Sequence, residues 1–588
     1  MNLVKSILGD IRLTGEMGNW QFSASAEILE PGLELIYLRF NAPAADIPPH
    51  VMLEWSTPQI DVQCRWLPIM RFFRYPPPNW SSAVPSSLTS SIPLMQFLNS
   101  KGENRILVAV SDAMRKLNMK GGICEETNCI DFQIELFSTP EAPISSCELI
   151  LRLDARKLFF ADAIRSATDW YASFPEYAPT PVPDAAFEPI YSSWYSYHQN
   201  LFAATLEAEC RRAAELGMKG IIVDDGWQTD DTNRKFAFCG DWCISKRRFP
   251  DMRSHVEKIH SLGMKYIVWY SVPFVGEKSE NFSRFKSQFL YVNNRARAGV
   301  LDPRFPDVRD FLISTYENAL KEWNIDGFKL DVIDSFDFKE EDPALQDDYA
   351  GRDIRSLPEA VDKLLSDVMA RLKKIKPDIL IEFRQSYIGP AIRKYGNMLR
   401  SADCPGDILS NRVNTIDLRL TSGKTAVHSD MLEWNYNDTP EIAALQFLNI
   451  LFSVPQISIR IAELPEAHRK MLHFWLDFWI QHRELLLHGY LKPYHPELNY
   501  PIVSVENEKE KLIAVYQSGQ YAEIDCEAGK ICHVVNASAS QSLVLELKHS
   551  PISCEYYDTM GNSVPGPAIQ AGLARIPIPA SGLLKITF

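Results

Sequence analysis

The sequence has no uninterrupted apolar run of about 18 residues, so no membrane-spanning helix is expected. It also shows neither an internal repeat nor a low-complexity tract. The chain has no excess of positive charge: it contains 61 lysines and arginines and 75 aspartates and glutamates, which gives a net charge of −14. Such a chain has no electrostatic attraction for nucleic acid or an anionic membrane, and we expect neither as a partner.

Cysteine patterns typical of a metal site are missing. The chain has 11 cysteines, and the pair Cys239 and Cys243 has no matching His or Cys pair nearby, so no metal site is expected. Scattered thiols are typical of a reducing compartment. The first 20 residues are interrupted by charges and lack the apolar stretch of a signal peptide. We expect a cytoplasmic protein, while the sequence is also compatible with the mature form of a secreted one.

The chain of 588 residues is too long for a single hydrophobic core. Residues 1–177 contain segments such as Leu33–Phe40 and Ile130–Phe137, in which apolar and polar residues alternate as in half-buried strands. They predict an N-terminal β-sandwich, followed by a stiff proline-rich linker at Ala178–Asp184. Residues 492–588 return to short strands and predict a small C-terminal antiparallel β domain.

Residues 185–490 have a different sequence pattern, which predicts short apolar strands alternating with amphipathic helices. The strands expected there include Gly220–Asp224, Lys265–Tyr270, Gly327–Asp331 and Ile379–Phe383, and the helices include Ala203–Leu216, Val308–Trp323 and Leu357–Ile375. This alternation and the segment's length predict an α/β fold with a central (β/α)8 TIM barrel. Ligands of such barrels bind at the carboxyl ends of the strands.

Acidic residues stand at those strand ends. Asp331 closes the strand Gly327–Asp331, and Lys329 points to the same side, where an ammonium keeps a carboxylate ionised. Asp224 and Asp225 follow another strand and offer acceptors for neighbouring hydroxyls of a sugar. A structural Lys–Asp pair explains the first pattern equally, and a helix N-cap or a loop turn explains the second.

Each of four further residues likewise has a functional and a structural interpretation, and a fifth is considered as a metal ligand. Arg400 and Asp403 offer a second acid beside a guanidinium, or a plain salt bridge. Trp194 and Trp269 stand at strand ends and suit stacking on a sugar ring, or burial in the core. Asp430 lies two residues after His428, with too few ligands nearby for a metal.

In their order along the chain these segments resemble the α-galactosidase clan, glycoside hydrolase families 27 and 36, and family 36 most closely. The plant raffinose synthases are near relatives of that family. The similarity runs from about residue 190 to 461. It is carried by Tyr191-Ser-Ser-Trp-Tyr195, Ile222-Val-Asp-Asp-Gly-Trp227, Gly327-Phe-Lys-Leu-Asp331, Arg400-Ser-Ala-Asp403 and His428-Ser-Asp-Met-Leu432.

The resemblance implies a retaining exo-acting α-glycosidase with no metal or organic cofactor. Asp331 would be the nucleophile and Asp403 the acid/base, with the pKa of Asp403 raised before the sugar is transferred. Substrate ligands would be Trp194, Asp224, Asp225, Trp269, Lys329, Arg384, Arg400 and Asp430. The implied partner is an oligosaccharide or another glycoside, and the family leads us to expect homo-oligomers.

Two segments depart from the family pattern. The Gly-rich, Cys-containing loop after strand five is replaced by Glu382–Pro390, which brings Arg384 to the region that recognises the sugar 2-position. Strand three reads Trp269-Tyr-Ser-Val-Pro273 in place of the usual Glu-Pro-Glu. The alternatives to hydrolysis are a raffinose-synthase-like α-galactosyl transferase and a noncatalytic carbohydrate-binding barrel. The second predicts the loss of a catalytic acid.

Overall fold

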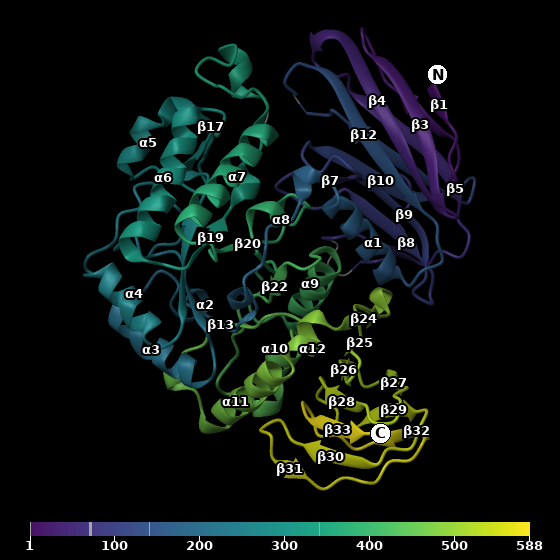
Figure 1. The fold of residues 1–588 in the computed structure, drawn as a ribbon, viewed down its shortest axis with the longest axis vertical. Helices are drawn as coiled ribbons and strands as arrows, with labels where there is room; N and C mark the ends of the chain where they lie inside the picture. The colour runs from purple at the N-terminus through teal and green to yellow at the C-terminus, as the bar shows by residue number, and fades with distance from the viewer. Residues whose placement is uncertain (1, 70–72, 140, 340) are drawn as a thin grey trace.

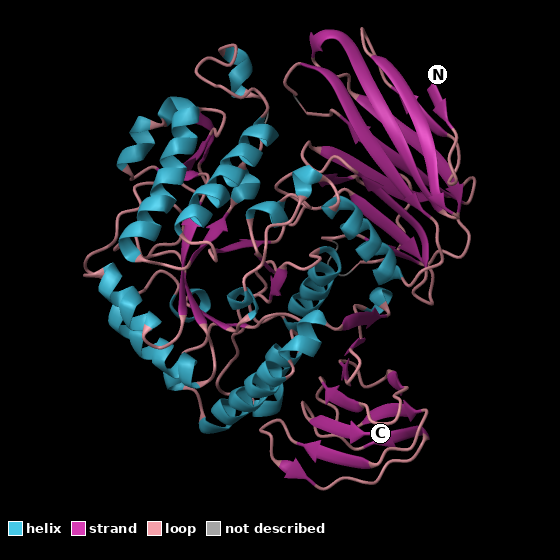
Figure 2. Cartoon of the chain, in the orientation of Figure 1, coloured by secondary structure: helices cyan, strands magenta, loops and turns pink. Residues whose placement is uncertain are grey.

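The computed structural model describes residues 2–69, 73–139, 141–339 and 341–588. Along the chain it forms a β-sandwich, a barrel wrapped in helices, and a second β domain (Figure 1). Figure 2 shows that the helices surround the barrel, while the two flanking parts consist mainly of strands and loops. None of the helices in the described ranges combines the length and the apolar character that crossing a membrane requires.

The N-terminal sandwich has two six-stranded sheets. The first contains, in spatial order, β1 (Asn2–Val4), β2 (Ile11–Thr14), β5 (Val51–Pro58), β11 (Cys129–Leu136), β10 (Leu117–Cys124) and β7 (Val84–Ser86). The second contains β3 (Gln21–Glu30), β4 (Leu33–Asp46), β12 (Ile144–Asp154), β9 (Asn104–Val110), β8 (Leu94–Leu98) and β6 (Cys64–Trp66). In β11 every second side chain is buried, and Phe132 stacks on Trp55 of β5. The alternation therefore creates one apolar face per sheet, as the sequence predicts.

The barrel sheet has eight parallel strands. Their spatial order is β22 (Ala426–His428), β21 (Met398–Arg400), β20 (Leu380–Arg384), β19 (Gly327–Asp331), β15 (Lys265–Ser271), β14 (Gly220–Val223), β13 (Ile190–Ser192) and β23 (Gln456–Ile457). Two isolated bridges, His428 to Val454 and Leu432 to Ile457, join the two ends of the sheet, so it is nearly closed. The predicted α/β barrel is confirmed, and the Gly327–Asp331 strand has the predicted bounds.

Helices cover the outside of this sheet. The chain's α-helices are α1 (Phe160–Ala172), α2 (Trp194–Tyr197), α3 (Ala203–Glu215), α4 (Met252–His260), α5 (Glu280–Arg284), α6 (Pro306–Trp323), α7 (Leu357–Ile375), α8 (Ile392–Tyr395), α9 (Ile408–Thr421), α10 (Pro440–Leu448), α11 (Glu466–Gln481) and α12 (Arg483–His488). Helix α7 matches its prediction because Ser356 caps its N-terminus and Pro358 favours its first turn. Its apolar residues fall on one buried stripe, which packs against the barrel.

The C-terminal domain corrects one detail of the prediction, because its sheets are mixed and not wholly antiparallel. One sheet contains β24 (Tyr490–Tyr494), β25 (Ile502–Glu506), β26 (Glu510–Val515), β28 (Ile531–Asn536), β33 (Leu583–Thr587), β30 (Ser553–Tyr557) and β31 (Ser563–Val564), and the other β27 (Tyr521–Ile524), β29 (Leu543–Leu547) and β32 (Gly572–Ile576). Strands β26 and β28 are parallel because the chain crosses to the other sheet for β27 and then returns. The pair β27 and β29 is parallel for the same reason.

One buried acid joins all three parts of the molecule. Asp417 of α9 accepts hydrogen bonds from Trp66 and Arg74 of the N-terminal sandwich, at 3.0 and 2.8 Å. It also accepts one from the hydroxyl of Tyr500, at the start of the C-terminal domain, at 2.6 Å. Buried charges persist in proteins when they are paired and hydrogen-bonded in this way. Asp417 therefore fixes the flanking β domains against the barrel.

Candidate active site

A cavity of about 680 Å³ opens at the carboxyl ends of the barrel strands. Nine of the ten residues singled out from the sequence line it: Trp194, Asp224, Asp225, Trp269, Lys329, Asp331, Arg384, Arg400 and Asp403. They come from β19, β15, β20 and β21 and from the segments that follow β13, β14 and β21. The topology therefore brings together side chains that are up to about 200 residues apart in sequence.

Asp331 is held by hydrogen bonds on both carboxylate oxygens. Its Oδ1 accepts from Arg384 Nε at 2.7 Å and from the Tyr387 hydroxyl at 2.6 Å. It also accepts from the backbone N–H of Val332 at 2.7 Å, while Oδ2 accepts from Trp269 Nε1 at 2.9 Å. Both oxygens are thus fixed in orientation, which is what an attack on a sugar carbon requires.

These partners also set the charge of Asp331. Burial disfavours the ionised carboxyl, but the cations Arg384 and Lys329 and the bonds from Tyr387 and Trp269 outweigh it, so the pKa of Asp331 lies well below its usual range. The group is therefore a carboxylate at every pH at which the protein is expected to work. Such a group serves as a nucleophile and is a poor proton donor.

The chain is strained directly beside this carboxylate. Val332 has a φ of 56°, in the left-handed region that β-branched residues rarely adopt. This conformation directs the Val332 N–H to Asp331, and the Tyr387 hydroxyl is 3.2 Å from the same nitrogen. Sequence reasoning did not assign Tyr387, because only the fold of the segment after β20 brings it to β19.

Asp224 and Asp225 follow β14 with different neighbours. Lys329 Nζ donates to Asp224 Oδ2 at 2.6 Å, and both side chains are buried at the cavity floor. Asp225 accepts from Gln199 at 2.5 Å and from Gln228 at 2.7 Å. Burial raises the pKa of Asp225 to about 6, although both amides favour its charged form. Neither acid caps a helix, so the N-cap interpretation of this pattern is wrong.

Gly226 makes the turn that presents these acids. Its φ is +121°, and a Cβ there would lie 2.6 Å from the Cα of Gln199. Only glycine permits this close approach of the loop after β14 to the segment after α2. The approach in turn allows Gln199 to bond Asp225.

Asp403 lies on the open side of the cavity. Its side chain is 52% exposed, and Arg400 donates to its Oδ1 at 2.7 Å. The protein around the carboxyl disfavours its charged form, but the cations Arg400, Arg384 and Lys329 outweigh that effect and lower the pKa of Asp403. The expectation of a raised pKa in the free enzyme is therefore wrong, because three cations from three strands converge here.

Asp430 is the one predicted ligand that does not line the cavity. It is fully buried behind Arg400, with which it forms an ion pair. It also accepts from the Tyr195 hydroxyl at 2.8 Å and from the backbone N–H of Cys404 at 2.6 Å. Asp430 thus lies outside the cavity lining and orients Arg400, which does line it.

The two tryptophans divide between the two interpretations. Trp194 is half-buried at the cavity edge, with the guanidinium of Arg234 5.8 Å from its ring centre. Trp269 is 2% exposed, bonds Asp331, and stacks against Phe236 at 6.0 Å. Trp194 thus remains the better stacking surface, whereas Trp269 mainly holds the carboxylate.

The cavity rim carries cations that sequence reasoning missed. Arg234 and Lys235 come from the loop after β14, and Arg295 lies between β17 (Phe289–Asn293) and β18 (Ala298–Leu301). All three are exposed, and Arg234 contacts His198. Within the described parts of the chain, neither Lys235 nor Arg295 forms an ion pair or a side-chain hydrogen bond. The rim is thus locally positive on a protein of net charge −14.

Comparisons with known proteins point to one family. A family model described as Melibiase matches residues 186–389. The α-galactosidase AgaA of Geobacillus stearothermophilus is 32% identical over 130 residues, which are 21% of this chain and 17% of that protein. An α-galactosidase of Escherichia coli is 22% identical over 179 residues, or 29% of this chain and 25% of that protein. The matched stretch spans only about one fifth of the first curated relatives.

Solved structures extend the similarity to the whole fold. The crystal structure of the family 36 α-galactosidase AgaA from Geobacillus stearothermophilus superposes with a TM-score of 0.64 at 15% identity, over 99% of this chain and 89% of that one. A variant of the same enzyme in complex with raffinose gives a TM-score of 0.63 at 15% identity, over 95% and 79%. These matches confirm the fold and the resemblance to the α-galactosidase clan, family 36 in particular.

Proposed function

We propose that this chain, whose barrel resembles those of the family 36 α-galactosidases, is a retaining exo-acting α-glycoside hydrolase that releases a terminal α-linked galactose or a related sugar. The observation that carries the proposal is the pair of acids in one cavity: Asp331, enclosed and ionised, and Asp403, open to solvent. Glycoside hydrolysis requires two carboxyl groups with different tasks. Asp403 is the more exposed of the two, at 52% against 13% for Asp331, and so is the one that takes up from solvent the proton it gives to the leaving oxygen.

In the proposed mechanism Asp331 attacks the anomeric carbon while Asp403 gives a proton to the leaving oxygen, which forms a glycosyl ester on Asp331. Asp403 then takes a proton from water, and water cleaves the ester. Because Asp403 is partly exposed, it exchanges protons with solvent between the two steps. Asp224, Asp225 and Lys329 hold sugar hydroxyls at the cavity floor.

The direct test is a release assay with p-nitrophenyl α-glycosides of galactose, N-acetylgalactosamine, glucose and galacturonic acid, and with the β-L-arabinopyranoside. We expect turnover of the galactoside or of one of its close analogues. No release from any of these glycosides, or from raffinose and stachyose, would overturn the proposal. An added acceptor sugar distinguishes hydrolysis from transfer, because a transferase releases free sugar slowly and accumulates the transfer product.

The pKa of Asp225 leads to a prediction about substrate affinity. Since its pKa is raised to about 6, Asp225 is mostly ionised at pH 8 and mostly protonated at pH 5. The protonated group loses acceptor capacity for sugar hydroxyls, so KM for a neutral galactoside should rise as pH falls through about 6. The variant Asp225→Asn should lose this inflection, while Asp230→Asn, in the same loop but exposed, should keep it. An unchanged pH profile of KM in Asp225→Asn would contradict the assignment.

The positive rim leads to a prediction about the leaving group. We expect Lys235 and Arg295 to favour glycosides whose leaving group carries a carboxylate. The ratio of kcat/KM for p-carboxyphenyl over p-nitrophenyl α-galactoside should fall by about threefold for each of Lys235→Gln and Arg295→Gln, the size of an exposed charge pair. High salt should reduce the same ratio in the unaltered enzyme. Equal losses with both substrates would rule out a charge effect.

A further inference from the structure

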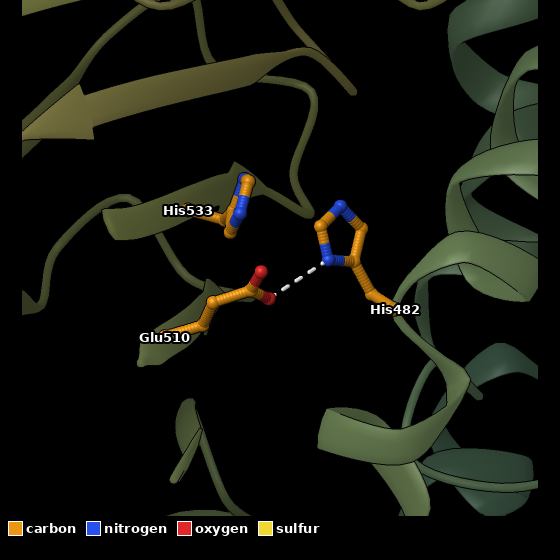
Figure 3. A group of neighbouring side chains, drawn as sticks. All are labelled: His482, Glu510 and His533. Atoms are coloured by element: carbon orange, nitrogen blue, oxygen red, sulfur yellow. Dashed lines mark hydrogen bonds and ion pairs between the residues drawn. The ribbon is translucent and has the colours of Figure 1, made fainter. Parts of the chain in front are cut away.

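A second cluster of polar side chains lies where the barrel meets the C-terminal domain (Figure 3). His482 separates α11 from α12, Glu510 begins β26, and His533 lies on β28. One ligand atom of each lies within 4.8 Å of the others, and His482 Nδ1 is 3.0 Å from Glu510 Oε2. None of the three lines the catalytic cavity.

The parallel pairing of β26 and β28 creates this arrangement. Glu510 pairs with Ile531 and Leu512 with His533, so Glu510 and His533 point from the same face of the sheet. Figure 3 shows His482 approaching them from the helical side. The site is thus built from two domains: the barrel contributes His482, and the C-terminal domain contributes Glu510 and His533.

His533 indicates that the cluster is incomplete as it stands. The residue is only 4% exposed, and neither ring nitrogen has a hydrogen-bond partner within the described chain. Its neighbours are the rings of His482 and Phe478, at 4.4 and 5.6 Å. Buried polar atoms are nearly always hydrogen-bonded, because an unpaired one loses its bonds to water and gains none in return. A packing role alone would suit an apolar residue better.

The charges around the cluster do not oppose the binding of a cation. Lys585, the strand neighbour of His533 on β33, is paired with Glu555 at 3.0 Å. The side chain of Glu510 is 30% exposed, so an ion and a water molecule can reach the cluster from solvent. Two imidazole nitrogens and one carboxylate oxygen form a donor set that zinc binds in proteins, with water at the fourth position.

We propose that His482, Glu510 and His533 bind one divalent transition-metal ion, with zinc as the best match, and that the ion clamps the C-terminal domain to the barrel. The role is structural, because the site is built at the domain junction and does not face the substrate cavity. A ligand that binds only the docked arrangement stabilises it.

The test uses the full-length protein and zinc itself. After incubation with zinc chloride and desalting, metal analysis should give close to one zinc per chain, and the Tm should rise by several degrees and return with EDTA. Glu510→Gln and His533→Leu should each lose both effects. His549→Ala, an exposed histidine of the same domain, should keep them. Cobalt should give the intense visible bands of tetrahedral coordination in the unaltered chain and in His549→Ala, but not in Glu510→Gln or His533→Leu.

The proposal fails if the unaltered protein retains no zinc and its Tm does not respond. It also fails if Glu510→Gln binds as much zinc as the unaltered protein. Glu510 is the safer substitution because it is half-buried, so its variant decides the question even if His533→Leu does not fold. These measurements do not depend on glycosidase activity, so their failure is distinct from failure of the proposed function.

Discussion

Replacing Asp331 with Asn or Gly should lower kcat by at least about 10⁴-fold, because the proposed mechanism forms its covalent intermediate on the Asp331 carboxylate. Asp331→Asn keeps the shape of the side chain and the bond from Trp269, so the fold should survive. The matched control is Asp367→Asn, a partly exposed acid on α7, which should retain full activity. Initial rates with p-nitrophenyl α-galactoside measure both.

A stronger form of this experiment uses azide. In Asp331→Gly the space left by the carboxylate admits azide, which attacks the anomeric carbon and displaces the leaving group. The expected product is the β-glycosyl azide, with inverted configuration, and the rate should rise with azide concentration. Substantial hydrolysis by Asp331→Asn, or rescue that yields an α-glycosyl azide, would contradict the assignment of Asp331.

Replacing Asp403 with Asn should lower kcat/KM by about 10²–10⁴-fold for substrates whose leaving group needs a proton, such as raffinose. For a dinitrophenyl α-galactoside the first step needs no proton, so kcat/KM should change little. Asp331→Asn should lose activity on both substrates, which makes it the matched control. An equal loss on both substrates in Asp403→Asn would argue that Asp403 binds the sugar and does not donate a proton.

The sign of the pKa shift on Asp403 gives this prediction a pH dependence. Arg400, Arg384 and Lys329 lower the pKa of Asp403 in the free enzyme. Its protonated form therefore becomes scarcer as pH rises through the acid range. The kcat/KM for raffinose should fall with rising pH in that range, and the fall should be much weaker for the dinitrophenyl substrate.

Much of this site can be predicted from local sequence. The strand Gly327–Asp331 is apolar up to its final acid, and a barrel places every such acid at one end. Asp224 and Asp225 follow from the same rule. The hydrogen-bond donors to these acids cannot be predicted in this way. Gln199, Gln228 and Tyr387 reach Asp225 and Asp331 only once the loops have packed.

The errors have the same origin. Asp430 follows a barrel strand, as the cavity residues do, but packing decides how deeply its side chain lies in the barrel. The side chain is buried in an ion pair with Arg400, which lies between it and the cavity. The shift in the pKa of Asp403 depends on three cations that come from three strands, so no local sequence pattern predicts its direction. The parallel pair β26 and β28 likewise depends on which sheet β27 joins.

The measurement that tests the central claim most directly is the anomeric configuration of the first sugar released. Proton NMR during the early turnover of p-nitrophenyl α-galactoside, before mutarotation, should show α-galactose appearing first. Double displacement through Asp331 requires this retention. Initial appearance of β-galactose would mean a single attack by water, and would contradict a glycosyl ester on Asp331.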